Sequence, residues 1–208
     1  ISIERIWNEL ERIILGPNAD FVLARMNRDG VLPAIIGYPL PFESFELVTK
    51  LPSDLEARIA ILFSSLKSLE VNDILMRLRA PKKVIKRCRH LHFLIDNTPA
   101  EHELRLYRMI VSKEVNTHIS LASATGKVTS LIEKSLQYPT DITCLVDGEW
   151  LMKKTKFEPG MKLGRLKDWL YRIQIERGYT SIAQMETALC TIPWNEGDSS
   201  QWPKVQWP

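Results

Sequence analysis

Seven cationic side chains crowd into the thirteen residues from Arg77 to Arg89, and no acidic residue interrupts them. A solvated helix face usually mixes both signs of charge, whereas an unmixed run can bind phosphates by releasing their counterions. Pro81 suits the start of a helix. The apolar residues beyond it would face inward: Val84, Ile85, Cys88 and Leu91. A solvated face remains the alternative, and we predict RNA-backbone contacts by Arg77, Arg79, Lys82, Lys83, Lys86, Arg87 and Arg89.

A second candidate phosphate site is the loop that leads into a helical pattern starting at Met161. The N–H groups at a helix N-terminus attract phosphate, and a glycine there lets a ligand approach closely. We predict RNA contacts by Gly160, Lys162, Gly164 and Arg165. The alternative is a plain loop-to-helix joint in which Gly164 packs against a neighbouring helix.

Residue types that catalyse reactions or bind metals are present, but not at a useful spacing. Cys88, His90 and His92 stand two residues apart, and such residues point to different faces of a helix. Nucleotidyl transfer needs paired carboxylates for two magnesium ions, yet the chain has no Asp-x-Asp, and its nearest approach is Asp-Gly-Glu at residues 147–149. Nucleophile-elbow and phosphate-loop motifs are also missing. We therefore predict no catalytic residue and no metal ligand in this chain.

The composition is that of an ordinary globular protein, with 45% hydrophobic residues, 25% charged residues and a net charge of +3. Three scattered cysteines without a C-x-x-C pair favour a reducing intracellular compartment, with cytoplasm, nucleus and mitochondrion all open. No apolar run approaches the ~20 residues of a membrane span, so we expect no membrane partner. Because Ile1 already lies in a helical pattern, we expect a fragment that has lost N-terminal sequence.

The first helix shows the clearest periodicity, because Ile3, Trp7, Leu10 and Ile14 share one face. Ser2 is its candidate N-cap. On its polar face, Arg5 and Glu9 have the spacing of an ion pair.

Helical periodicity continues along the chain without sustained β alternation, so we predict an all-α fold with at most one short strand near residues 142–146. Residues 1–50 form a first group of helices, residues 51–138 a helical body and residues 139–192 a small helical tail domain. Residues 193–208 are rich in proline and tryptophan. For these we expect disorder, with docking of the tryptophans as the alternative.

Two motifs resemble the C-terminal part of class II CCA-adding tRNA nucleotidyltransferases, a family that includes the bacterial poly(A) polymerases. Residues 145–153 read Leu-Val-Asp-Gly-Glu-Trp-Leu-Met-Lys and residues 158–165 read Glu-Pro-Gly-Met-Lys-Leu-Gly-Arg, similar to the family's tail. Residues 2–10, Ser-Ile-Glu-Arg-Ile-Trp-Asn-Glu-Leu, resemble the helix that starts the neck. The sequences of these motifs are more similar to those of eukaryotic members, except that Met161 stands where the family usually has a second proline.

The resemblance implies the neck, body and tail of such an enzyme, with tRNA as partner and with Ser2, Arg5 and Glu9 bracing the catalytic head. The implied reaction transfers CMP and AMP from CTP and ATP to the tRNA 3′ end, with Mg2+ bound by a head outside this chain. This chain alone is then expected to be inactive. Two alternatives stay open: a poly(A) polymerase or an A-adding or CC-adding relative, and a non-catalytic helical module that binds RNA or protein.

Overall fold

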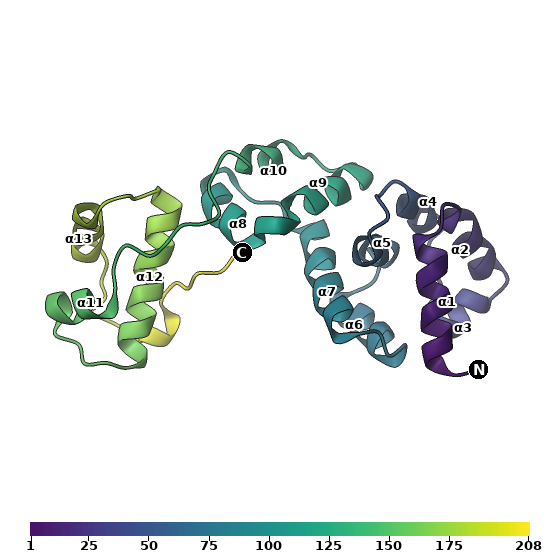
Figure 1. Cartoon of the computed structure of the whole chain (residues 1–208), viewed down its shortest axis with the longest axis horizontal. Helices are drawn as coiled ribbons and strands as arrows, with labels where there is room; N and C mark the ends of the chain where they lie inside the picture. The colour runs from purple at the N-terminus through teal and green to yellow at the C-terminus, as the bar shows by residue number, and fades with distance from the viewer. The chain divides into compact units, whose positions relative to one another are not determined.

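The computed structural model describes residues 1–208 and contains helices and irregular segments only, which confirms the predicted all-α fold (Figure 1). It divides into two compact units, residues 1–98 with 116–129, and residues 99–115 with 130–208. The first unit contains α1 (Ile3–Leu15), α2 (Ala19–Arg28), α3 (Val31–Ile36), α4 (Glu43–Thr49), α5 (Leu55–Leu62), α6 (Ser68–Arg77), α7 (Lys82–Asp96) and all but the first residue of α9 (Val115–Ala124). The second contains η1 (Glu101–Glu103), α8 (Leu104–Val111), η2 (Ser112–Glu114), α10 (Ser130–Ser135), α11 (Gly148–Thr155), α12 (Met161–Arg177), α13 (Ile182–Thr191) and η3 (Ser199–Gln201).

Helix α5 is the centre of the first unit, because every residue from Ala57 to Leu62 is buried. Asp54 caps its N-terminus and accepts a hydrogen bond of 3.1 Å from the N–H of Ala57. The helix packs against α1, α4 and α7. A helix that is buried on all sides needs neighbours on all sides, so α5 determines where the other three helices lie.

Arg58 is the one charged residue buried in α5, with 7% of its surface exposed. Its guanidinium donates four hydrogen bonds to backbone carbonyls, and no carboxylate pairs with it. The acceptors are Ile14 at 2.8 Å, Gly16 at 3.2 Å, Leu51 at 3.0 Å and Pro52 at 3.0 Å. Ile14 lies in the last turn of α1, and the other three acceptors follow the ends of α1 and α4, where helices leave C=O groups without partners. Arg58 therefore joins the ends of two helices to the central one.

Helix α12 has the same central place in the second unit, where it packs against α8, α11, α13 and η3. One face of it is buried: Leu163, Leu166, Leu170, Gln174 and Ile175. That face meets side chains from the rest of the unit: Val146, Leu151, Met185, Leu189 and Trp202. The sequence placed a domain joint near residues 138–141, whereas the second unit begins at residue 99, because α8 packs against both α10 and α12.

The segment before α11 contains no strand. Its backbone N–H and C=O groups form hydrogen bonds with the side chain of Gln174 on α12. The side-chain amide of Gln174 donates to the carbonyl of Thr143 at 2.8 Å, and its oxygen accepts from the N–H of Leu145 at 2.9 Å. The hydroxyl of Tyr171 also donates to the carbonyl of Ile142. Side chains of α12 thus satisfy backbone groups that a sheet would otherwise satisfy.

The tail after α13 packs on its own unit through its aromatic residues. Trp202 lies against Trp169, with ring centroids 5.6 Å apart, and Trp207 meets Tyr107 edge-on at 4.8 Å. The indole N–H of Trp207 also donates to Glu103 at 3.3 Å. Of the two arrangements that composition left open, the structure has the tryptophans docked.

We expect Arg58→Met to destabilise the first unit by at least about 4 kcal/mol. Methionine keeps the apolar stem of the side chain but leaves the four carbonyls without their donor, and buried unsatisfied acceptors cost about 1–3 kcal/mol each. Urea unfolding followed by circular dichroism measures the change. Arg12→Met is the control, because the exposed Arg12 side chain makes one surface pair with Glu9 at 3.2 Å. Equal stability of the two variants would contradict the role assigned to Arg58.

We also expect stability to fall between pH 6.5 and pH 4 because of His118. Its side chain is 1% exposed, and burial lowers its pKa to about 4, against the effect of its hydrogen bond to the Leu94 backbone. In that pH window the unfolded chain binds a proton that the folded chain does not, so acid favours unfolding. His118→Asn should remove about 2 to 3 kcal/mol of the loss between pH 7 and pH 4.5. Urea unfolding at both pH values is the measurement, and an unchanged difference would contradict the assignment.

Candidate nucleic-acid interface

Four of the seven predicted cations form an exposed row on α7. Lys82, Lys83, Lys86 and Arg89 are exposed, and none of them has an ion pair or hydrogen bond within the chain. Lys82, Lys86 and Arg89 have i, i+4 and i+7 spacing, which places them on one face. The opposite face is buried through Val84, Cys88, Leu91, His92, Leu94 and Ile95. Ile85, which we predicted to face inward, is only half-buried and borders the exposed row.

Arg87 lies in the same run but is held by acidic residues of the α5 end. Its Nη atoms contact the two carboxylate oxygens of Asp54 at 2.6 and 2.7 Å, and Nη1 also contacts Glu56 at 3.0 Å. Burial opposes ionisation of Asp54, but the hydrogen bonds from Arg87 and Ala57 outweigh it and lower its pKa. The side chain predicted to contact RNA therefore fastens α7 to α5. Sequence reasoning missed this pair because its members stand 33 residues apart.

Arg77 and Arg79 are likewise engaged within the first unit. Arg77 donates to the carbonyl of Ile35 at 3.3 Å. Its guanidinium lies 3.1 Å from the position that a Cβ on Gly37 would occupy, and Gly37 has a φ of +83°. Arg79 pairs with Glu4 of α1. Both side chains are exposed, yet each connects the end of α6 to an earlier helix.

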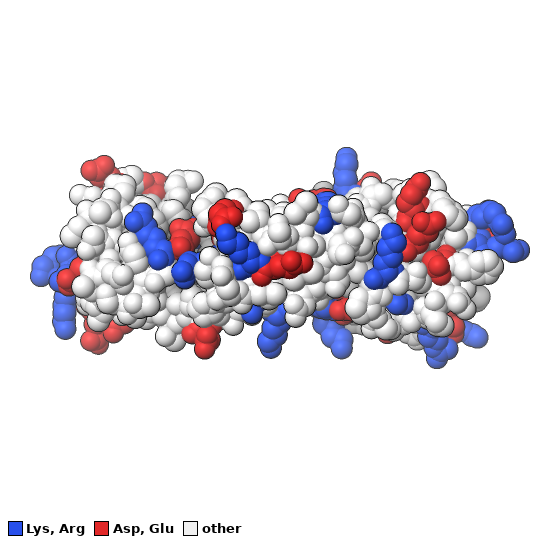
Figure 2. All heavy atoms as spheres, turned by 90° about the horizontal axis from the view of Figure 1, so that it is seen from above, with Lys and Arg blue, Asp and Glu red and all other residues white.

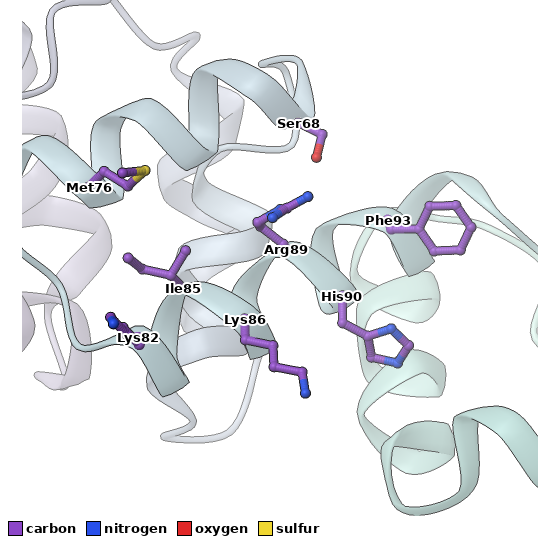
Figure 3. A pocket seen from close by; sticks show the side chains of 8 residues that line it. All are labelled: Ser68, Met76, Lys82, Ile85, Lys86, Arg89, His90 and Phe93. Carbon is purple, nitrogen blue, oxygen red and sulfur yellow. The ribbon is translucent and has the colours of Figure 1, made fainter.

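A groove of about 610 Å3 runs between α6 and α7 beside the exposed row (Figure 3). It is lined by Ser68, Met76, Lys82, Ile85, Lys86, Arg89, His90 and Phe93. Met76 is 61% exposed and Phe93 is 37% exposed. In Figure 3 Arg89 points toward Ser68 across the groove, while Lys86 and His90 extend to its other side. Ile85, Arg89 and Phe93 recur every four residues, which was the sequence signal for a groove-facing row that our periodicity argument missed.

Charge is mixed on the face of the molecule that Figure 2 views, where Lys and Arg are interspersed with Asp and Glu. With a net charge of +3, the chain has little overall attraction for polyanions. Any binding of nucleic acid therefore depends on local groups of cations such as the row on α7.

The start of α12 is open, and neither Gly160 at its N-cap nor Gly164 in its first turns packs against another part of the chain. Gly160 has a φ of 165°, an extended conformation that any residue adopts, and a Cβ at Gly164 would meet nothing within 4 Å. The alternative in which Gly164 packs against a neighbouring helix is therefore wrong. Lys162 lies 4.4 Å above the ring of Phe157, and Arg165 is half-buried. The structure thus brings these four predicted residues together at an exposed helix end.

At the start of α1, the predicted cap is confirmed and the predicted ion pair is wrong. The Ser2 hydroxyl accepts from the N–H of Arg5 at 3.4 Å. Glu9 pairs with Arg12 at 3.2 Å instead of with Arg5. Three residues separate Glu9 from Arg12, so the pair forms on the same turn of the surface. Arg5 is exposed and has no ion pair in the chain.

Cys88 and His92 lie on the buried face of α7 and are core residues. Burial raises the pKa of the Cys88 thiol to about 12, and a ring nitrogen of His92 lies 3.1 Å from the carbonyl oxygen of Phe63. The chain has no group of three or more His, Cys, Asp or Glu side chains that could hold a metal ion.

No helix has both the length and the apolar character needed to cross a membrane. A scan against protein-family models gives no match, and searches among curated proteins and solved structures find no similar protein.

Proposed function

We propose that this chain is the RNA-holding part of a tRNA nucleotidyltransferase of the CCA-adding class. The observation that carries the proposal is the row of four exposed cations on α7, none of which has a partner within the chain. Their side chains are available to phosphates, which bind cations in exchange for counterions. The resemblance of the first helix and of the α11–α12 region to the family supplies the enzyme class.

Within this proposal, α7 holds the RNA backbone and reads no base. Phosphate contacts fix the position of a nucleic acid and carry no sequence information. That suits an enzyme whose substrates share a shape and differ in sequence. Arg77, Arg79 and Arg87 support the row indirectly, because their contacts hold α6 and α7 against α1, α3 and α5.

The open loop before α12 is the second proposed RNA contact. Residues 160–165 offer the first N–H groups of a helix of 17 residues, together with Lys162 and Arg165. Partial positive charge at a helix N-terminus favours an anion there. The start of α1 is proposed to contact protein instead of RNA, with the exposed Arg5 binding the catalytic head.

The chemical step belongs to that head, outside this chain. Two-metal nucleotidyl transfer uses Mg2+ held by paired carboxylates, and this chain has no cluster that fits the ions. We therefore assign the chain no step of the reaction and no contact with CTP or ATP. The same surface would serve a poly(A) polymerase, an A-adding or CC-adding relative, or a non-catalytic RNA-binding module.

We expect the triple variant Lys82→Ala, Lys83→Ala, Lys86→Ala to bind tRNA more weakly and with a smaller salt dependence. Removing one lysine–phosphate interaction should flatten the slope of log K against log salt by roughly 0.7 to 0.9, so removing all three should flatten it by about two to three. The decrease in affinity should be equal for tRNAs of different sequence. Titrations of two tRNAs at several salt concentrations provide the measurement.

The matched control is Lys50→Ala, Lys113→Ala, Lys204→Ala, which removes the same charge from exposed sites on other segments of the chain. Neither triple variant should change stability by more than about 0.5 kcal/mol per site, because all six side chains are on the surface. Equal slopes for the two triple variants would refute the assignment of the phosphate contacts to α7.

We expect Gly164→Ala to stabilise the second unit while weakening tRNA binding. Alanine gains about 0.5–1 kcal/mol over glycine in a helix, and the open space at residue 164 admits its methyl group. Gly164→Asp adds a negative charge and should weaken binding by about two- to fivefold. Thermal unfolding and tRNA titration are measured on both variants. Wild-type affinity in both would show that this loop does not contact tRNA.

A further inference from the structure

We propose that the groove between α6 and α7 binds an unpaired stretch of RNA, with one base stacked on Phe93 (Figure 3). This inference rests on the proposed RNA contact of α7 and narrows its ligand from RNA in general to a single strand. The row of cations alone would suit any phosphate backbone. The apolar side chains of the groove are what distinguish single strands from duplexes.

The groove combines the two chemistries that single strands require. Lys82, Lys86 and Arg89 supply charge along one helix, and none of them is neutralised within the chain. Phe93 and Met76, which line the same groove, are 37% and 61% exposed to solvent. Proteins that bind single strands pair a basic track for the backbone with aromatic rings for the bases.

The length of the groove also fits a short single strand of RNA. Eleven residues separate Lys82 from Phe93 on α7, which is about 16 Å at a rise of 1.5 Å per residue. A nucleic-acid strand advances about 3.4 Å per stacked nucleotide, so the groove spans about five nucleotides. A strand running along the groove from Lys82 to the ring of Phe93 would therefore pass Lys86 and Arg89.

A duplex and an acidic protein fit less well. In double-stranded RNA the bases are stacked inside, so a duplex offers phosphates to the cations but no base face to Phe93. An acidic peptide would meet the cations but has no aromatic face that repeats with its charge. A nucleotide strand carries both in every unit, which matches the mixed lining of Ile85, Met76 and Phe93 beside the cations.

Fluorescence anisotropy with the full chain tests the proposal, using a six-nucleotide single-stranded RNA and a blunt RNA duplex as probes. We expect Phe93→Leu to weaken single-strand binding at least about fivefold, because leucine offers no aromatic ring on which a base can stack. Phe93→Trp should retain it, and duplex binding should change less than twofold in either variant. Met76→Glu is a second variant that leaves Phe93 in place. Because Met76 is 61% exposed, this change should weaken single-strand binding without disturbing the fold.

Phe21→Leu is the matched control, because Phe21 is 72% exposed on α2 and lies outside the groove. Circular dichroism checks that each variant folds. If the chain binds tRNA but neither Phe93→Leu nor Met76→Glu affects the single strand, this inference fails and the proposed function stands. If neither tRNA nor RNA oligonucleotides bind, both fail. Tighter binding of an acidic peptide than of RNA would assign the groove to a protein partner and overturn the inference.

Discussion

The arrangement of helices in the first unit depends on one buried guanidinium, that of Arg58, which joins the ends of α1 and α4 to α5. Arg58 donates to four carbonyls at or just beyond the C-terminal ends of α1 and α4, and it does so from inside α5 without an acidic partner. A charge in such a position is costly unless its donors are used, and the hydrogen bonds are what make its burial tolerable. The position of α7 follows from the same helix, because Arg87 holds it to the carboxylates at the start of α5. The surface proposed to bind RNA is therefore built on α5.

The basic run shows how one sequence feature divides into two physical roles. Arg77, Arg79 and Arg87 have polar partners within the chain, whereas Lys82, Lys83, Lys86 and Arg89 have none. The planar arginine fork suits fixed, multidentate contacts, and lysine is a flexible and strongly hydrated point charge. Three arginines assemble the helices, and the lysines with Arg89 remain at the surface.

Local patterns were enough to predict the fold class and the basic helix, because both follow from the spacing of neighbouring residues. The Ser2 cap and the start of α7 after Pro81 are of this kind. The partners of the arginines could not be predicted, since Glu4 lies 75 residues before Arg79 and only packing brings them together. The groove lined by Phe93 was missed for the same reason, because its second wall comes from α6. Neighbour spacing thus gives the helices, while the distribution of charge among them depends on tertiary contacts.

Neither packing nor backbone conformation explains why residue 164 is a glycine. A glycine within a helix is less stable than alanine by about 0.5–1 kcal/mol, and such a cost is usually offset by close packing or by an unusual φ. Neither applies here, because no atom lies within 4 Å of the missing Cβ and the residue is an ordinary part of α12. Nothing within the fold compensates for this lower stability. The proposed second RNA contact would account for a glycine here, because a ligand at this helix end could then approach the backbone closely.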